Sequence, residues 1–258
     1  WANKLLSKLQ VEQYKNDGYV VPDFNMPESI LKKIENRHDE LLQKYPQFKN
    51  YCPAILHYDE SFIEFCKNEI ILNYVEQILG SDFALWNSSF FAKPAINGHA
   101  TPWHQDGQYW PIRPLATCTV WLAIDDANIE NGCLRFIKGS HKDKKLKNHN
   151  VNDNKNLTLN QELDEEEYNE NDAVNLILKR GQISLHDVYL VHGSEANKSS
   201  MARRAITMRF MPTSSVFDHQ MVKDKNLFSK ANVGKYGNRK IYHMRGKDIS
   251  GKNNLTYI

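Results

Sequence analysis

Apolar residues recur at helical spacing in the first third of the chain. Residues 3–16 and 27–44 combine this spacing with good helix formers, which predicts two amphipathic helices. Residues 60–66 and 69–79 predict two shorter helices, the second ended by Gly80. The first third of the chain is therefore expected to be helical.

From Phe83 onward, the residues become aromatic and β-branched, and the hydrophobic pattern alternates with a period of two. Asn, Asp and Gly separate the apolar runs, as is typical of turns. The predicted strands have the sequences F-A-L-W-N-S-S-F-F-A-K, T-C-T-V-W-L-A-I, C-L-R-F-I, Q-I-S-L-H, V-Y-L-V-H and A-I-T-M-R-F-M. Many short strands after a helical segment predict a mainly β fold with N-terminal helices, a jelly-roll or cupin-like barrel that carries the helices on one side.

The pattern predicts one domain over residues 1–258, a length that suffices for a single substantial core. Residues 1–82 are expected to form a helical support and residues 83–212 the barrel. The basic C-terminal segment, residues 213–258, lacks strong periodicity, so we expect it to wrap around the outside of the domain.

Residues 141–175 interrupt the strand pattern with a segment rich in Lys, Asn, Asp and Glu. The favoured interpretation is a solvated surface insertion. The alternative is a mobile lid over the mouth of the barrel, since long loops often cover active sites.

The composition excludes several classes of protein. Apolar residues make up 41% and charged residues 25%, and the formal net charge is +2, so nothing favours a nucleic-acid-binding surface. No apolar run is long enough to span a membrane, and no signal-peptide core is visible. We expect a cytoplasmic protein, although the chain starts at Trp1 rather than Met, so preceding residues and a targeting signal stay open.

The four cysteines, Cys52, Cys66, Cys118 and Cys133, form no C-x-x-C pair. Cys118 and Cys133 lie in apolar runs and are expected to act as small buried hydrophobic residues in a reducing compartment. The spacing does not favour a zinc site.

One pair of motifs carries candidate chemistry. His104 and Asp106 stand two residues apart, so both side chains point to the same side of an extended chain. His192 would complete a set of two imidazoles and one carboxylate, which suits non-haem Fe(II) and leaves three coordination positions open. Arg203 follows His192 by 11 residues, and no other histidine has an arginine at that distance. A buried cation there would hold the distal carboxylate of a dicarboxylic co-substrate.

A second H-x-D triplet, His57-Tyr58-Asp59, serves as an internal control. It lies between helix-like segments and no strand pattern follows it. The alternative for His104 and His192 is that both are core histidines bonded to the backbone. The strand context and the distal pair favour the metal site.

The chain resembles the phytanoyl-CoA dioxygenase family over roughly residues 83–212. The resemblance is carried by T-P-W-H-Q-D-G-Q-Y-W-P, T-V-W-L-A-I-D-D, E-N-G-C-L-R-F-I-K-G-S-H and V-H-G-S-E-A-N-K-S-S-M-A-R-R-A. It implies a double-stranded β-helix and an oxygenase that uses Fe(II), 2-oxoglutarate and O2. In related halogenases a small residue replaces the metal carboxylate, so Asp106 implies oxygenation rather than halogenation.

The resemblance also implies co-substrate contacts. Arg203 would clamp the distal carboxylate, because a guanidinium matches a carboxylate in two-pronged geometry. Ser194 would help to hold it, or be a turn residue. Trp121 would lie near the co-substrate, or in the core. Lys93 would meet an anion, or extend to solvent. Arg204 alternates to the other face of the strand and should point away.

Four residues near the metal motif are weaker candidates for the substrate pocket, and a structural loop is the alternative for the last three: Gln105, Tyr109, Trp110 and Arg113. Gln105 should face away from the two ligands that flank it. An arginine in this loop would favour an anionic group on the substrate. In G-S-H, we interpret His141 as structural.

The leading functional hypothesis is hydroxylation of a small polar or anionic metabolite. The first alternative uses the same cofactors for desaturation or oxidative cyclisation in a natural-product pathway. The second is a non-catalytic metal-binding barrel, which an intact triad together with Arg203 disfavours. The expected partner is a small molecule, not nucleic acid or a membrane, and the oligomeric state stays open.

Overall fold

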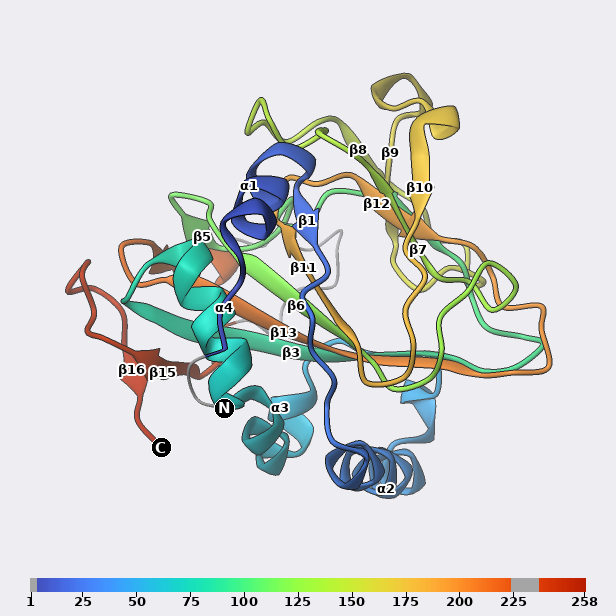
Figure 1. The fold of residues 1–258 in the computed structure, drawn as a ribbon, viewed down its shortest axis with the longest axis horizontal. Coiled ribbons are helices and arrows are strands. Elements are labelled where there is room, and N and C mark those ends of the chain that lie inside the picture. Colours follow the sequence, from blue (N-terminus) through green and yellow to red (C-terminus); the bar gives the residue numbers. More distant parts are fainter. Residues whose placement is uncertain (1–3, 224–236) are drawn as a thin grey trace.

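Two β-sheets face each other in the computed structural model, which describes residues 4–223 and 237–258 (Figure 1). The larger sheet has the order β1-β11-β6-β13-β3-β15-β16, and β2 also pairs with β3. Its strands are β1 (Tyr19–Val20), β2 (Tyr51–Cys52), β3 (Phe83–Lys93), β6 (Cys118–Ala123), β11 (Ile183–Asp187), β13 (Arg203–Pro212), β15 (Ile241–Arg245) and β16 (Leu255–Thr256). All its pairings are antiparallel except the one between β15 and β16.

The smaller sheet has the order β10-β7-β12-β4 and is antiparallel. Its strands are β4 (Thr101–His104), β7 (Leu134–Ile137), β10 (Ala173–Asn175) and β12 (His192–Ser194). Two further antiparallel pairs join β5 (Ile112–Arg113) to β14 (Val216–Phe217) and β8 (His149–Val151) to β9 (Gln161–Leu163). This is the predicted jelly-roll arrangement, a double-stranded β-helix.

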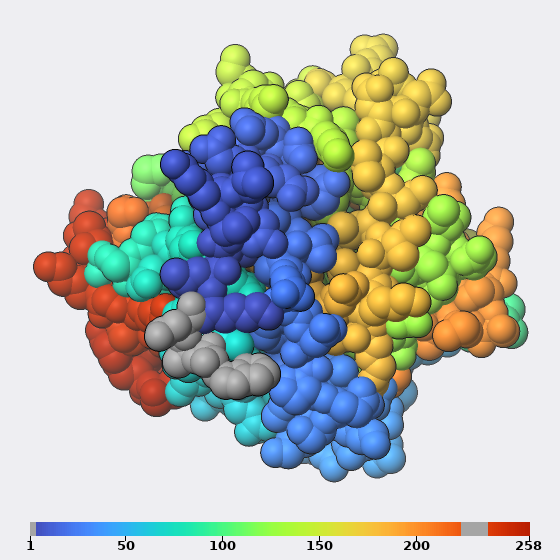
Figure 2. Space-filling view, viewed as in Figure 1, coloured from blue at the N-terminus to red at the C-terminus, as the bar shows by residue number. Residues whose placement is uncertain are grey.

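The long helices belong to the N-terminal part, and α2 to α4 lie along the outer face of the larger sheet (Figure 1). The α-helices are α1 (Lys8–Asp17), α2 (Glu28–Lys44), α3 (Ile55–Tyr58) and α4 (Glu69–Leu79), and the 3-10 helices are η1 (Pro46–Phe48), η2 (Glu60–Cys66), η3 (Glu165–Glu167), η4 (Glu170–Asp172) and η5 (Met221–Lys223). The space-filling view shows the N-terminal helices, in blue, covering much of one face of the molecule (Figure 2).

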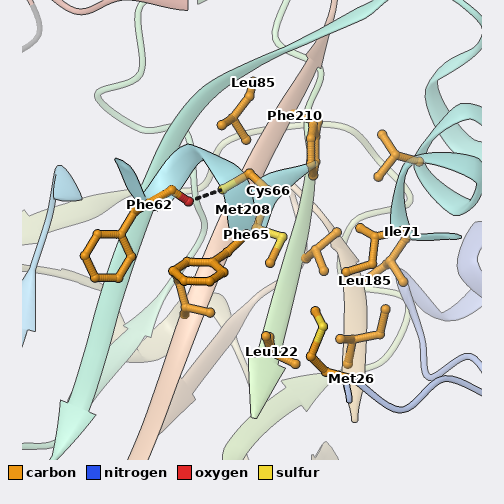
Figure 3. Packing of buried hydrophobic residues seen from close by; sticks show 14 of the residues in the cluster. Met26, Phe62, Phe65, Cys66, Ile71, Leu85, Leu122, Leu185, Met208 and Phe210 are labelled. Atoms are coloured by element: carbon orange, nitrogen blue, oxygen red, sulfur yellow. Dashed lines mark hydrogen bonds between the residues drawn. The ribbon is translucent and has the colours of Figure 1, made fainter. Parts of the chain in front are cut away.

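Side chains along each strand of the larger sheet point alternately to its two faces, so one face packs in the hydrophobic core and the other faces the smaller sheet. In β13, Ile206, Met208 and Phe210 point outward and pack against Phe65 and Ile71 from the helical layer (Figure 3). The residues between them face the smaller sheet and are largely polar. One face of the larger sheet therefore stabilises the fold by burying apolar surface, while its other face is free to build chemistry.

Two sequence predictions need correction. The first helix starts at Lys8 rather than at residue 3, because Ser7 and Gln10 form a capping box that fixes its N-terminus. The run V-Y-L-V-H is not a strand: a turn in which Leu190 N donates to Asp187 O follows β11, and β12 begins only at His192. Residues 60–66 are helical as predicted, but as a 3-10 helix.

The C-terminal segment does more than wrap around the domain. β15 pairs with β3 and extends the larger sheet, and β14 pairs with β5 near the barrel end. Residues 224–236 of this segment lie outside the described residues. No helix in the described part is both long and apolar enough to cross a bilayer.

All four cysteines are free and buried, as expected from their apolar surroundings. Burial raises the pKa of the Cys66 thiol to about 12, which makes it a poor nucleophile at neutral pH. We expect alkylation without reductant to label four thiols in denaturant and none rapidly in the folded protein. Mass spectrometry measures both, and a disulfide between Cys118 and Cys133 would contradict the expectation.

Candidate metal centre and adjoining cavities

Three buried side chains converge between the two sheets. His104 ends β4 and His192 begins β12, and the two residues are paired directly across the smaller sheet. Asp106 follows in a turn, not in the strand as the i, i+2 argument assumed, yet Oδ1 lies 3.4 Å from His104 Nε2 and 3.6 Å from His192 Nε2. The three ligand atoms lie within 4.8 Å of one another, so one ion can contact all of them.

Hydrogen bonds to the backbone set the tautomer of both imidazoles. His104 Nδ1 lies 2.7 Å from Pro102 O, and His192 Nδ1 lies 2.8 Å from Leu190 O. A carbonyl oxygen only accepts, so each Nδ1 carries the proton and each Nε2 presents its lone pair toward Asp106. Such outer hydrogen bonds are typical of metal-binding histidines.

The electrostatics keep the cluster in its metal-binding charge state. Burial lowers the pKa of His192 well below its ordinary value, and the neighbouring His104 adds to this. Burial alone would raise the pKa of the Asp106 carboxyl, but the surrounding imidazoles of His192, His104 and His186 hold it well below its usual range. A neutral imidazole beside an ionised carboxylate is the donor set that a divalent cation needs.

His186, in β11, was not singled out from the sequence. Its Nε2 lies 3.2 Å from Asp106 Oδ2, the oxygen that faces away from the two other ligands. His186 therefore orients Asp106 from the larger sheet, while His104 and His192 come from the smaller one. The signal was available: L-H-D-V-Y-L-V-H places this histidine six residues before His192, in a predicted strand.

A small cavity of about 30 Å³ adjoins the triad, and polar atoms without partners in the described part of the chain line it. Arg203 is almost completely buried; Nη1 donates to Gly132 O at 2.8 Å, while Nε has no partner among the described residues. Ser194 Oγ is likewise buried and unpartnered. Unsatisfied donors of this kind are costly, so the donor set fits a bound carboxylate. Trp121 lines the cavity, with its ring 5.1 Å from Arg203 Cζ.

The two adjacent arginines of β13 have opposite surroundings. Burial lowers the pKa of Arg203 to about 10, so the guanidinium still carries its charge at neutral pH. Arg204 faces the outer side, where it donates from Nε to Asp125 at 2.9 Å and from Nη2 to Glu35 at 2.8 Å. The strand register assigned from the sequence thus agrees with the geometry.

Lys93 is buried beside Arg203 rather than in the wall of the small cavity. The two residues are paired between β3 and β13, and Lys93 Nζ donates to the carbonyls of His99 and Glu195, each at 2.6 Å. Burial, followed by the charge of Arg203, holds its pKa well below the ordinary value. Both of these hydrogen bonds of Lys93 go to the backbone, so the side chain holds two loops together beside Arg203.

A larger cavity of about 420 Å³ lies beside Asp106 and shares Phe91 and Arg209 with the small cavity. Asp106, Tyr109 and Trp110 line it, together with Arg209 from β13. Residues 152–161 of the insertion form much of the remaining wall, with amide and hydroxyl groups and the charged side chains of Asp153 and Lys155. A cavity of this size fits a small ligand, and its lining favours a polar one.

Two of the weaker pocket candidates do not line this cavity. Gln105 faces away from the metal ligands, as expected, and holds the insertion: its amide donates to Lys145 O and accepts from Lys147 N. Its backbone N also donates to His149 Nε2 at 2.9 Å. Arg113 is exposed, and its Nη1 donates to two nearby backbone carbonyls.

The insertion is thus anchored at its start and forms a wall of the cavity farther along. Its polar composition, which favoured a solvated loop, also suits a polar cavity wall. The two interpretations of the insertion, a solvated surface loop and a lid, differ in whether a bound ligand protects residues 152–161.

We expect limited proteolysis within residues 152–161 to slow severalfold when metal, 2-oxoglutarate and substrate are all bound, because these residues line the larger cavity. Cleavage sites and rates are read by mass spectrometry. Equal cleavage rates with and without ligands would instead support the solvated loop.

Comparisons with known proteins agree with this geometry. Residues 4–205 match the family model described as phytanoyl-CoA dioxygenase. The chain is 26% identical to the peroxisomal phytanoyl-CoA dioxygenase of Homo sapiens over 81% of this chain and 69% of the relative.

Solved structures of related fold include the non-heme monooxygenase ThoJ, with a TM-score of 0.71 and 22% identity, covering 95% of this chain and 86% of ThoJ. EctD from S. alaskensis, solved with 2-oxoglutarate and 5-hydroxyectoine, has a TM-score of 0.67 and 18% identity, covering 83% of this chain and 79% of EctD.

Proposed function

Because the chain belongs to the phytanoyl-CoA dioxygenase family, we propose that it hydroxylates a small polar or anionic metabolite with Fe(II), 2-oxoglutarate and O2. It is an enzyme of the 2-oxoglutarate-dependent non-haem iron class. The observation that carries the proposal is the triad beside two cavities, a small one with unpaired cationic and hydroxyl donors and a larger one with a polar wall.

In this proposal His104, Asp106 and His192 hold the iron. The Nδ1 hydrogen bonds keep both Nε2 atoms unprotonated, and His186 keeps one oxygen of Asp106 turned toward the cluster. When bound, iron supplies oxygen activation: 2-oxoglutarate loses CO2 and becomes succinate, which takes up one oxygen atom, and the other enters a substrate C–H bond. The chain itself orients the reactants and excludes water from them.

Arg203 is assigned to the distal carboxylate of 2-oxoglutarate. Its unpaired Nε and the unpaired Ser194 Oγ face the same small cavity, so both gain an acceptor when the carboxylate enters. The Trp121 ring beside the guanidinium fixes its plane. Buried Lys93 lies next to Arg203 and donates to backbone carbonyls, without lining the cavity itself.

The larger cavity is assigned to the substrate. Tyr109 and Trp110 provide aromatic surface beside Asp106, and the insertion provides amide and hydroxyl groups. We place the enzyme in a reducing, cytosol-like compartment, which suits its four free cysteines.

The test is a screen of small polar metabolites with enzyme, Fe(II), 2-oxoglutarate and O2, read by mass spectrometry. Hydroxylation is expected to add one oxygen atom to one class of compounds, with matching succinate formation. A product that has lost two hydrogen atoms would indicate desaturation or oxidative cyclisation instead of hydroxylation. If 2-oxoglutarate is never consumed under any condition, the proposed function is wrong.

A further inference from the structure

Arg209, from β13, is a buried cation that lines the larger cavity and also borders the small cavity beside Arg203. Arg209 is only 7% exposed, and it is absent from every ion pair found in residues 4–223 and 237–258. Its Nε is buried and without an acceptor in the described part of the chain. Arg209 lies close enough to Asp106 for its charge to act on that carboxylate, but its Nε makes no hydrogen bond there, so the Nε edge suits a further anionic partner.

Contacts with the protein fix the Arg209 side chain and leave one edge open. Nη1 donates to Ser89 Oγ at 2.6 Å and lies 3.3 Å from Thr207 Oγ1. The guanidinium carbon lies 5.2 Å from the Trp110 ring and 5.9 Å from the Phe91 ring. With Nη1 occupied and the plane held between rings, the Nε edge is the one left for a two-pronged partner, and a carboxylate matches it.

The strand register separates this cation from the co-substrate clamp along β13 and places it level with His186. Arg203 and Arg209 are six residues apart on the same inner face of β13, about 20 Å along an extended strand. Arg209 pairs across β13 and β6 with Thr119, which pairs with His186. Arg209 is thus two strand spacings, about 10 Å, from the histidine that orients Asp106.

We propose that Arg209 anchors a carboxylate of the substrate in the larger cavity, a few carbon atoms from the metal. This inference rests on the proposed function and names the substrate class: a small carboxylic acid with a polar body. One strand then carries two cations with separate tasks. Arg203 lines the small cavity of about 30 Å³, whereas Arg209 borders that cavity and also lines the larger one of about 420 Å³.

The first test uses the wild-type protein loaded with Zn(II) and saturated with 2-oxoglutarate, so that the Arg203 site is filled. Butyrate and its neutral amide, butyramide, are titrated separately and followed by ligand-detected NMR. We expect butyrate to bind about tenfold or more tightly, because a hydrogen-bonded charge pair outweighs a neutral contact. Equal binding of the two probes would overturn the inference.

The second test uses Arg209→Gln, with Arg113→Gln as the matched control. Arg113 is exposed and lies outside the cavity walls, so its removal should leave the preference for butyrate intact. Arg209→Gln should abolish the preference. If it survives in Arg209→Gln, Arg209 only orders neighbouring hydroxyls. Should Arg209→Gln fail to fold, Arg209→Lys keeps the charge but lacks the fork, and we expect it to weaken butyrate binding at least severalfold.

Failure of this inference can be told apart from failure of the proposed function. Succinate formation from 2-oxoglutarate by the wild-type Fe(II) enzyme tests the function alone. Succinate without any preference for butyrate would leave an oxygenase whose substrate is not anchored by Arg209. If the protein prefers butyrate but forms no succinate, the proposed function, on which the inference rests, is wrong.

Discussion

Replacing Arg203 with alanine should raise the apparent constant for 2-oxoglutarate by roughly two to three orders of magnitude. The guanidinium is almost fully buried, so the carboxylate would lose its charged partner in a site that water hardly reaches. Removing one partner of a buried ion pair costs about 3–5 kcal/mol. Succinate formation measured against 2-oxoglutarate concentration gives the constant, and a metal titration should show nearly unchanged Fe(II) affinity.

Arg204→Ala is the matched control from the next position of the same strand. It should leave the 2-oxoglutarate constant within about twofold, since Arg204 bonds Asp125 and Glu35 on the outer face. It should instead lower stability by about 1–3 kcal/mol, because it leaves Asp125 without its charged partner. If the two variants behaved in reverse, the strand register would be wrong by one residue; if neither affected 2-oxoglutarate, the co-substrate site would be wrong.

The second large effect concerns the triad. Asp106→Ala should abolish hydroxylation, and His192→Ala should lower Fe(II) affinity by at least about two orders of magnitude, because each removes a direct ligand. His186→Ala removes only the bond to Asp106 Oδ2, so a smaller loss of about 10- to 100-fold is expected. Anaerobic metal titration followed by calorimetry measures the Fe(II) affinity of the three variants, and a hydroxylation assay measures the activity of Asp106→Ala.

This series has its own control. His57 belongs to the second H-x-D triplet, in which His57 and Tyr58 lie in α3 and Asp59 caps it, away from the triad. His57→Ala should bind Fe(II) like the wild type. Unchanged Fe(II) affinity in His192→Ala would remove the metal assignment.

The sequence allowed the fold and the triad to be predicted for separate physical reasons. Alternating apolar positions mark strands such as Phe83–Lys93, whose predicted bounds match β3. Spacing and family resemblance pointed to His104, Asp106 and His192. The strand assumption failed at Asp106, which lies in a turn: Gly107 follows it with a φ of +84°, a conformation that glycine adopts without strain.

Contacts between segments that are distant in the sequence could not be predicted from it. Gln105 was expected to face away from the metal, and it does, but nothing local shows that it binds Lys145 and Lys147 of the insertion. Composition cannot separate a solvated loop from a polar cavity wall, since both need the same side chains. Arg209 lies an even number of residues from Arg203, so alternation alone could have placed it on the inner face.

The most direct test of the central claim is the fate of labelled oxygen. The wild-type Fe(II) protein is incubated with 2-oxoglutarate under ¹⁸O2, and the succinate is analysed by mass spectrometry. If the triad and Arg203 form an oxygenase site, succinate should carry one labelled oxygen atom and appear in equal amount with CO2. Unlabelled succinate, or 2-oxoglutarate left unconsumed, would contradict it.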